Sequence, residues 1–213
     1  MKYLIKNGRL IDPANKIDET CDVFIADGLI EKVGKNLNMK ADEVIDASNM
    51  IVAPGLVDMH THLREPGRED EETVRSATRA AVKGGFTSVA CMPNTEPAID
   101  DTAAVNMLKA VIKKDAICSV FIIGAITEDR LGRRLTDFKA MKKADVAGIS
   151  DDGASVADPK IMIEALEKAK KESLLIIEHC EDASISASGV MNKGFTATKM
   201  GLGAYQKRPN TRW

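Results

Sequence analysis

After Gly55, short apolar runs that resemble strands alternate with amphipathic runs that resemble helices. The strand-like runs are GLVDMHTH, FTSVACMPN, SVFIIGAIT, VAGISDDG and LLIIEHC, and they end near His62, Asn94, Ala125, Asp152 and His179. Successive ends are 27 to 32 residues apart, which is the length of one strand, one helix and their connections. The repeat therefore predicts an α/β fold in which right-handed crossovers join parallel strands.

The first fifty or so residues have a different pattern. YLIKNGRLID, CDVFIADGLIEKVG and EVIDASNMIVAPG are β-prone runs interrupted at Asn-Gly, Asp-Gly and Asn, which are hairpin signals. The sequence thus predicts three regions. Residues 1–54 form the amino-terminal part of a small β module of the sandwich type, residues 55–202 form repeated βα units, and residues 203–213 form a tail unlike either.

Polar residues gather where the predicted strands end. His60 and His62 close the first strand, Asn94 the second, Asp152 the fourth and His179 the fifth. In a (β/α)₈ TIM-type barrel, functional groups at the carboxyl ends of several strands face one mouth. An open doubly wound sheet would spread them along a crevice, and no glycine-rich nucleotide fingerprint follows the first strand. We therefore predict a barrel that is incomplete, with about five of its βα units.

Two of the three histidines, His60 and His62, lie one residue apart. Side chains alternate along a strand, so both imidazoles point to the same face. A lone histidine is more often a core or surface residue than a ligand, and Asp151-Asp152 before a glycine also matches a turn. Because every histidine lies at a strand end, we expect His60, His62, His179 and Asp152 to bind metal. These donors suit zinc with an open position for water, and a carboxylate can bridge two ions.

Two further polar residues have roles that the sequence alone leaves open. Arg64 follows the His-x-His pair, and its planar fork suits a substrate carboxylate. The alternative is a surface ion pair with Glu65 or Glu69. Asn94, just after Met92-Pro93, is able either to cap a turn or to hold a polar group of a substrate.

Composition narrows the class of protein. A formal net charge of −2 argues against nucleic acid or an anionic membrane as the main partner. The cysteines form no Cys-x-x-Cys pair, and three of the four lie in apolar or strand-like runs that favour reduced, buried thiols. The sequence has no recognisable signal peptide and no apolar run long enough for a membrane span. These features predict a soluble cytoplasmic protein.

The segments PGLVDMHTHLREPG, GGFTSVACMPNTEP, GAIT, SDDGASV and EHCED, in this order, resemble dihydroorotases of the bacterial multifunctional-complex type (class I), within the amidohydrolase superfamily. The resemblance runs from residue 1 to about Leu202. It implies a cyclic amidohydrolase that interconverts N-carbamoyl-L-aspartate and dihydroorotate in pyrimidine synthesis, with two zinc ions. By this resemblance His60 and His62 bind one ion, Asp152 bridges the two ions as a catalytic residue, and His179 binds the second.

The resemblance also assigns substrate contacts and partners. Arg64 and Asn94 match the positions that hold the substrate's carboxylate, and the substrate is a small molecule. Relatives of this type can associate with aspartate transcarbamoylase, and a homodimer is a further open alternative. The alternative within the superfamily is a hydantoinase or dihydropyrimidinase, many of which carry a carboxylated lysine at the fourth strand. Here that place reads GISDDG, which favours dihydroorotase.

The sequence departs from the resemblance after its fifth strand. The family has another zinc histidine and a late aspartate that serves as general base, whereas no histidine follows His179 in this chain. A back-translation of GAYQKRPNTRW, shifted by two bases, reads Gly-Ile-Pro-Lys-Lys-Ala-Glu, which the family places here. We therefore expect residues 203–213 to be a frameshift product of a truncated chain that binds zinc weakly and is inactive or a non-catalytic remnant. The encoding DNA would decide this.

Overall fold

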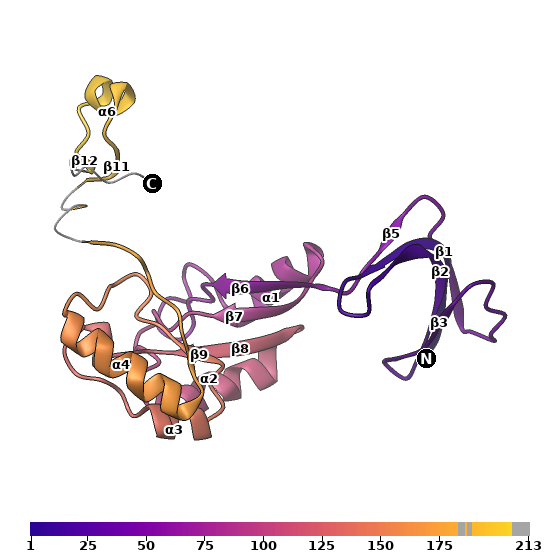
Figure 1. Cartoon of the computed structure of the whole chain (residues 1–213), viewed down its shortest axis with the longest axis horizontal. Helices are drawn as coiled ribbons and strands as arrows, with labels where there is room; N and C mark the ends of the chain where they lie inside the picture. The colour runs from indigo at the N-terminus through magenta and orange to yellow at the C-terminus, as the bar shows by residue number, and fades with distance from the viewer. Residues whose placement is uncertain (183–185, 187–188, 206–213) are drawn as a thin grey trace. The chain divides into compact units, whose positions relative to one another are not determined.

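The computed structural model describes residues 1–182, 186 and 189–205 (Figure 1). The chain divides into two compact units, Met1–Leu56 and Val57–Trp213, and each is described by itself. Of the tail predicted over residues 203–213, the part from 206 onward lies outside the described residues. None of the helices in the described part is both long and apolar enough to cross a membrane.

The first unit is a five-stranded mixed sheet. Its strands are β1 (Lys2–Asp12), β2 (Ile17–Ala26), β3 (Leu29–Gly34), β4 (Glu43–Asp46) and β5 (Ile51–Val52). β2 lies antiparallel to both β1 and β3, while β4 and β5 pair parallel with β1. Leu4 and Phe24 centre one small apolar cluster, and Leu10 and Val23 centre another. The β-rich pattern of the early sequence is therefore realised as one sheet.

Two of the three predicted turn signals of this unit, Asn7-Gly8 and Asp27-Gly28, behave differently. Asp27 and Gly28 both have positive φ, at 52° and 81°, and connect β2 to β3 as a hairpin. Asn7-Gly8, by contrast, lies inside β1, where the register with β2 shifts between Ile5 and Gly8. The interpretation of Asn7-Gly8 as a hairpin signal was therefore wrong. Its positive φ at Asn7, 64°, is accommodated as a bulge within a continuous strand.

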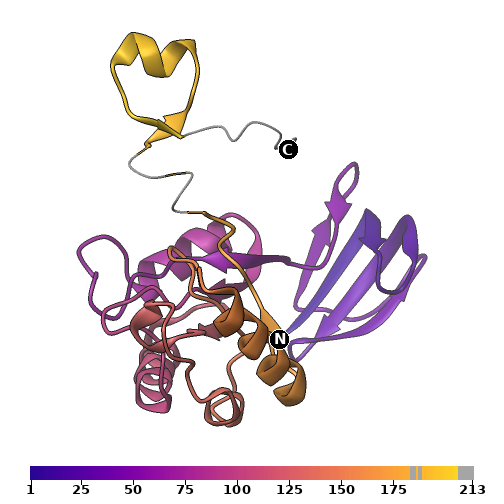
Figure 2. The ribbon, with the colours of Figure 1, turned by 60° about the vertical axis from the view of Figure 1, so that its left-hand side comes forward.

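The second unit contains a five-stranded sheet whose strands are arranged in chain order. β6 (Leu56–Thr61), β7 (Phe86–Cys91), β8 (Ser119–Gly124), β9 (Gly148–Ile149) and β10 (Leu175–Ile176) follow one another across it. β7, β8, β9 and β10 pair parallel with their neighbours. The crossovers carry α1 (Val74–Lys83), α2 (Thr102–Asp115), α3 (Phe138–Lys143) and α4 (Pro159–Glu172). Figures 1 and 2 show these helices beside the sheet, and each helix contacts the next one along the chain.

Local capping explains where these helices begin. The hydroxyl of Thr73 accepts from the backbone N–H of Ser76 and forms a capping box at α1. Asp101 caps α2 with its side chain alone, and its carboxylate lies 2.7 Å from the backbone nitrogen of Ala104. Asp158 caps α4, whose first residue is a proline, a residue that costs no hydrogen bond there.

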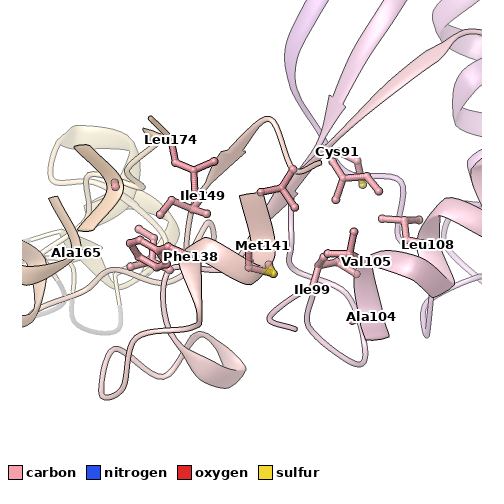
Figure 3. Close-up of a cluster of buried hydrophobic side chains, with 14 of the residues drawn as sticks. Cys91, Ile99, Ala104, Val105, Leu108, Phe138, Met141, Ile149, Ala165 and Leu174 are labelled. Carbon is pink, nitrogen blue, oxygen red and sulfur yellow. The ribbon is translucent and has the colours of Figure 1, made fainter. Parts of the chain in front are cut away.

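The main core lies between this sheet and its helices (Figure 3). Strand side chains such as Cys91 and Ile122 pack against Val105 and Leu108 of α2, and α3 contributes Phe138 and Met141. The architecture is the first part of a (β/α)₈ barrel, as predicted. Within the described residues the barrel does not close, because β6 and β10 form the two edges of the sheet.

The last described stretch pairs with itself. β11 (Met191–Asn192) and β12 (Ala204–Tyr205) form a two-stranded parallel pair on either side of α6 (Phe195–Met200). Gly203 to Tyr205, the described part of the predicted tail, thus includes β12.

Candidate metal centre

The carboxyl end of β6 presents two imidazoles on one face. His60 lies within the strand and His62 lies just past its last residue, Thr61. The alternation of a strand sends both side chains the same way, and the two ring centroids are 5.2 Å apart with planes inclined at 68°. The hydroxyl of Thr61 points the other way and donates to the carbonyl of Ala90 in β7, 2.8 Å away. This hydrogen bond fixes the end of β6 against the sheet.

Asp152 brings a buried carboxylate to these imidazoles. It lies three residues beyond the end of β9, and its side chain is 5% exposed. One carboxylate oxygen, Oδ1, is 3.3 Å from Nε2 of His60, and Oδ2 is 3.5 Å from Nε2 of His62. The donor atoms of these three residues all lie within 4.8 Å of one another. The two histidines lie at the end of β6, and Asp152 follows β9, three strands later. They meet because the carboxyl ends of parallel strands lie at the same edge of the sheet.

His179 follows β10 in the chain and lies beside the same carboxylate. Its Nδ1 lies 3.4 Å from Oδ1 of Asp152, and its Nε2 lies 3.0 Å from a carboxylate oxygen of Glu181. Hydrogen bonds from Ser186 and from His179 lower the pKa of Glu181. A carboxylate on the far nitrogen fixes the orientation of an imidazole and leaves the other nitrogen for a ligand.

Asn94 and Arg64 occupy different surroundings. Asn94 follows β7, and its amide oxygen lies 2.8 Å from Nδ1 of His62. With Nδ1 donating, the lone pair of His62 is on Nε2, toward Asp152. Arg64 has left-handed backbone geometry, with φ 61°, and its Nε lies 3.2 Å from a carboxylate oxygen of Glu71.

Arg64 forms an ion pair, but the two predicted partners, Glu65 and Glu69, are wrong. Glu65 instead accepts from the backbone nitrogen of Val74, at 2.8 Å, and so holds the start of α1. Glu69 accepts from the backbone nitrogen of Gly67, at 2.9 Å. Glu71, outside both alternatives, is the residue that pairs with Arg64. The binding of a substrate carboxylate by Arg64 stays a prediction.

Asp151 is a buried acid next to Asp152 that the sequence did not identify as part of the site. Asp151, considered only as a turn residue, is 2% exposed and accepts from the backbone nitrogens of Ile126 and Thr127 at 2.8 and 3.0 Å. The hydroxyl of Thr127 also donates to it. Burial raises the pKa of the Asp151 carboxyl. Its one sequence signal is an acid next to a predicted ligand at a strand end.

The donor set fits zinc. Imidazole nitrogens and a carboxylate are ligands that zinc accepts readily, and hydrolytic zinc sites keep one position open for water. Asp152 touches all three imidazoles, so its carboxylate is placed to be shared between ions. The role of these four residues as metal ligands stays a prediction.

A family model described as "Dihydro-orotase-like" matches residues 49–209 of this sequence. The chain belongs to the dihydroorotase-like family. The dihydroorotase of Elusimicrobium minutum is 48% identical over 202 residues, which are 95% of this chain and 47% of that relative. The dihydroorotase of Pelotomaculum thermopropionicum is 49% identical over 203 residues, again 95% and 47%. The chain thus spans about half the length of the curated relatives that it matches.

Solved structures support the dihydroorotase-like fold. The L-hydantoinase (dihydropyrimidinase) of Arthrobacter aurescens superposes with a TM-score of 0.76 at 19% identity, over 87% of this chain and 42% of that chain. A D-hydantoinase structure gives a TM-score of 0.71 at 25% identity, over 88% and 42%. At such identities the similarity concerns the fold, an amidohydrolase barrel of which this chain contains the first part.

Proposed function

We propose that this chain provides the zinc-binding part of a dihydroorotase site, formed by His60, His62, Asp152 and His179. The observation that carries the proposal is the convergence of three imidazoles on one buried carboxylate. Bound zinc would lower the pKa of a water toward neutrality and polarise an amide carbonyl. Relatives named dihydroorotase, at 44 to 49% identity, support this chemistry over that of other metal hydrolases.

The reaction proposed is the interconversion of N-carbamoyl-L-aspartate and dihydroorotate, in pyrimidine biosynthesis. Asp152 would serve as the catalytic bridge, because its Oδ1 lies near both His60 and His179, the imidazoles assigned to different ions. Asn94 orients His62 through Nδ1, and its amide nitrogen is left for a substrate oxygen. Arg64 offers the rest of its guanidinium fork to the substrate's carboxylate, with Nε held by Glu71.

The hydantoinase alternative has less support. The fold similarity to hydantoinases is at 19 to 25% identity, well below the identity to proteins named dihydroorotase. The turn after β9 contains Ser150, Asp151 and Asp152, and no lysine. Assays with dihydroorotate and with hydantoin as rival substrates separate the two, and turnover of hydantoin alone would favour the alternative.

Metal binding by the 213-residue chain tests the proposal directly. Cobalt(II) added to the metal-free protein should give the visible absorption of a nitrogen- and oxygen-bound ion, and zinc should displace it. Asp152→Asn should weaken binding strongly because it removes the shared ligand. Asp70→Asn is the matched control, since Asp70 is exposed in the same unit. Equal binding by wild type and Asp152→Asn would exclude the site.

Turnover is a separate question. The resemblance implies a further zinc histidine after the fifth strand, and no histidine follows His179 in these 213 residues. Losing even a group that orients a metal ligand costs about 10–100-fold in affinity or activity. We therefore expect zinc binding with turnover of dihydroorotate near background. Hydrolysis by the purified chain at ordinary enzymatic rates, with host enzyme excluded, would contradict this expectation.

A further inference from the structure

The loop after β8 reaches the turn that carries Asp152. Arg130 lies in this loop, and its Nη1 donates to the backbone oxygen of Asp152 at 2.7 Å. Its Nε is shielded from solvent and has no hydrogen-bond partner among the described residues. The arginine backbone is left-handed there, with φ 56°, a conformation that persists only where the surroundings fix it.

The loop itself is anchored by hydrogen bonds. The hydroxyl of Thr127 accepts from the backbone nitrogen of Gly132 at 2.8 Å and donates to Asp151. The backbone nitrogen of Glu128 lies 2.9 Å from the carbonyl oxygen of Arg134. Arg130 is therefore presented from a closed loop rather than from a free chain, and its position is determined before any ligand arrives.

The turn after Asp152 lies within van der Waals reach of Arg130. Gly153 has φ +78°, and a Cβ atom added there would lie 3.7 Å from Nη1 of Arg130 and 3.6 Å from Nδ2 of Asn94. The guanidinium thus packs against the turn that follows the carboxylate, near the amide that orients His62.

The carboxylate of Asp152 is held in place through the backbone of its turn. Both carboxylate oxygens face imidazoles, so they are the groups that a metal would recruit. Its backbone is constrained from two sides: Ser150 accepts from its nitrogen at 3.1 Å, and Arg130 donates to its oxygen. A charge-assisted hydrogen bond of this kind is stronger and more directional than a neutral one.

We propose that Arg130 is a positioning residue, which presets the carboxylate of Asp152 for metal by clamping the backbone of its turn. This inference rests on the proposed function. Two effects of the guanidinium oppose one another: the clamp favours metal, while its positive charge disfavours a cation nearby. We expect the clamp to have the larger effect on metal affinity, because it acts on Asp152, whose carboxylate contacts all three imidazoles.

Cobalt(II) titration of the 213-residue chain tests the clamp. Arg130→Met should raise the dissociation constant about 10–100-fold, as losses of partners that orient metal ligands do. Arg133→Met is the matched control, because Arg133 is exposed on the same loop, and it should bind as wild type. Arg130→Lys keeps a charged donor and should recover part of the loss.

A double-mutant cycle separates positioning from general damage. In the Asp152→Asn background, Arg130→Met should have little further effect, since the clamp acts through Asp152. A loss of the same size in both backgrounds would assign Arg130 a merely structural role. Circular dichroism establishes that each variant folds; if Arg130→Met does not, Arg130→Gln has the same expected loss of at least about tenfold.

The outcomes distinguish this inference from the proposed function. Wild-type protein that binds no cobalt would overturn both. Wild-type binding that depends on Asp152, with Arg130→Met unchanged, would overturn the clamp alone. Tighter binding by Arg130→Met would also overturn it, because charge repulsion would then be the dominant effect.

Discussion

Replacing Asp151 by alanine should destabilise the second unit by about 3 kcal/mol. The carboxylate accepts from the backbone nitrogens of Ile126 and Thr127, at 2.8 and 3.0 Å, and from the hydroxyl of Thr127. It thereby connects the end of β8 to the end of β9. Alanine would leave two buried N–H groups without an acceptor in a place that water does not reach.

The magnitude follows from two opposing contributions. Each buried donor left unpaired costs about 1–3 kcal/mol, so the two N–H groups together cost about 2–6 kcal/mol. Burial raises the pKa of the Asp151 carboxyl, which means that the ionised group is itself destabilised by desolvation. Removing it recovers part of that cost, and about 3 kcal/mol remains. Asp151→Asn keeps an oxygen acceptor and should lose only about 1 kcal/mol.

The raised pKa also fixes the direction of the pH dependence. The folded state holds the Asp151 proton more tightly than the unfolded state does, so its contribution to stability decreases as pH rises through the window between the two pKa values. Asp151→Asn lacks this titration. Its disadvantage relative to wild type should therefore shrink as pH rises through that window.

Urea unfolding of the metal-free chain, followed by circular dichroism, measures the loss. Amide hydrogen exchange at Ile126 and Thr127 gives a local readout, because these N–H groups should lose protection first. Asp70→Ala is the control, since Asp70 is exposed in the same unit. If Asp151→Ala shifts the unfolding midpoint no more than Asp70→Ala does, the reasoning fails.

Two other predictions concern thiols and a glycine. Burial raises the pKa of the Cys91 thiol to about 11, so Cys91 should resist thiol reagents at pH 8 while exposed Cys180 reacts; equal labelling rates in folded protein would contradict this. Gly67 has φ +97°, and a Cβ there would lie 2.1 Å from the backbone oxygen of Glu96. Gly67→Ala should therefore cost at least about 2 kcal/mol in urea unfolding. Gly85→Ala, with φ +86° and open space around it, should cost less, and a reversed order would refute the steric reasoning.

The parts of the fold that the sequence predicts are those governed by local rules. Helix α2 lies in one of the amphipathic runs between the strand-like segments, and it begins at Thr102 because Asp101 caps it. The run VAGISDDG, by contrast, contains only a two-residue strand, Gly148–Ile149. The backbone nitrogen of Ser150 still bonds to the carbonyl of Gly124. The chain then turns, and the carboxylate of Asp151 accepts from the backbone nitrogen of Ile126, which is a long-range contact.

The turn signals in the first unit illustrate the same limit. Asn7-Gly8 and Asp27-Gly28 are similar dipeptides, yet one is a bulge and the other a hairpin turn. The bulge has a partner in Asp22, whose carboxylate accepts from the backbone nitrogen of Asn7 at 2.9 Å and from that of Leu37 at 2.8 Å. This partner is remote in sequence, so local propensity carries no information about it.

For the candidate site, the shared face of His60 and His62 was predictable from the sequence, and the loop residues near Asp152 were not. His60 and His62 follow from strand alternation, and their chemistry is intrinsic to the residue type. Thr127 and Arg130 lie in a loop, where no periodicity restricts which side chain turns inward. Their proximity to Asp152 depends on how the loop closes, through contacts such as that between Thr127 and the backbone of Gly132.

The burial of the four predicted ligands suggests how metal binding would be divided among them. The side chains of His60, His62 and His179 are 48, 31 and 37% exposed, whereas that of Asp152 is 5% exposed. Imidazoles with this much exposure can adjust to an incoming ion, while the carboxylate is confined by its buried turn. Substituting one histidine removes one donor, but displacing Asp152 disturbs the contact that all three share. Binding should therefore be more sensitive to groups that hold the Asp152 turn than to those around any single imidazole.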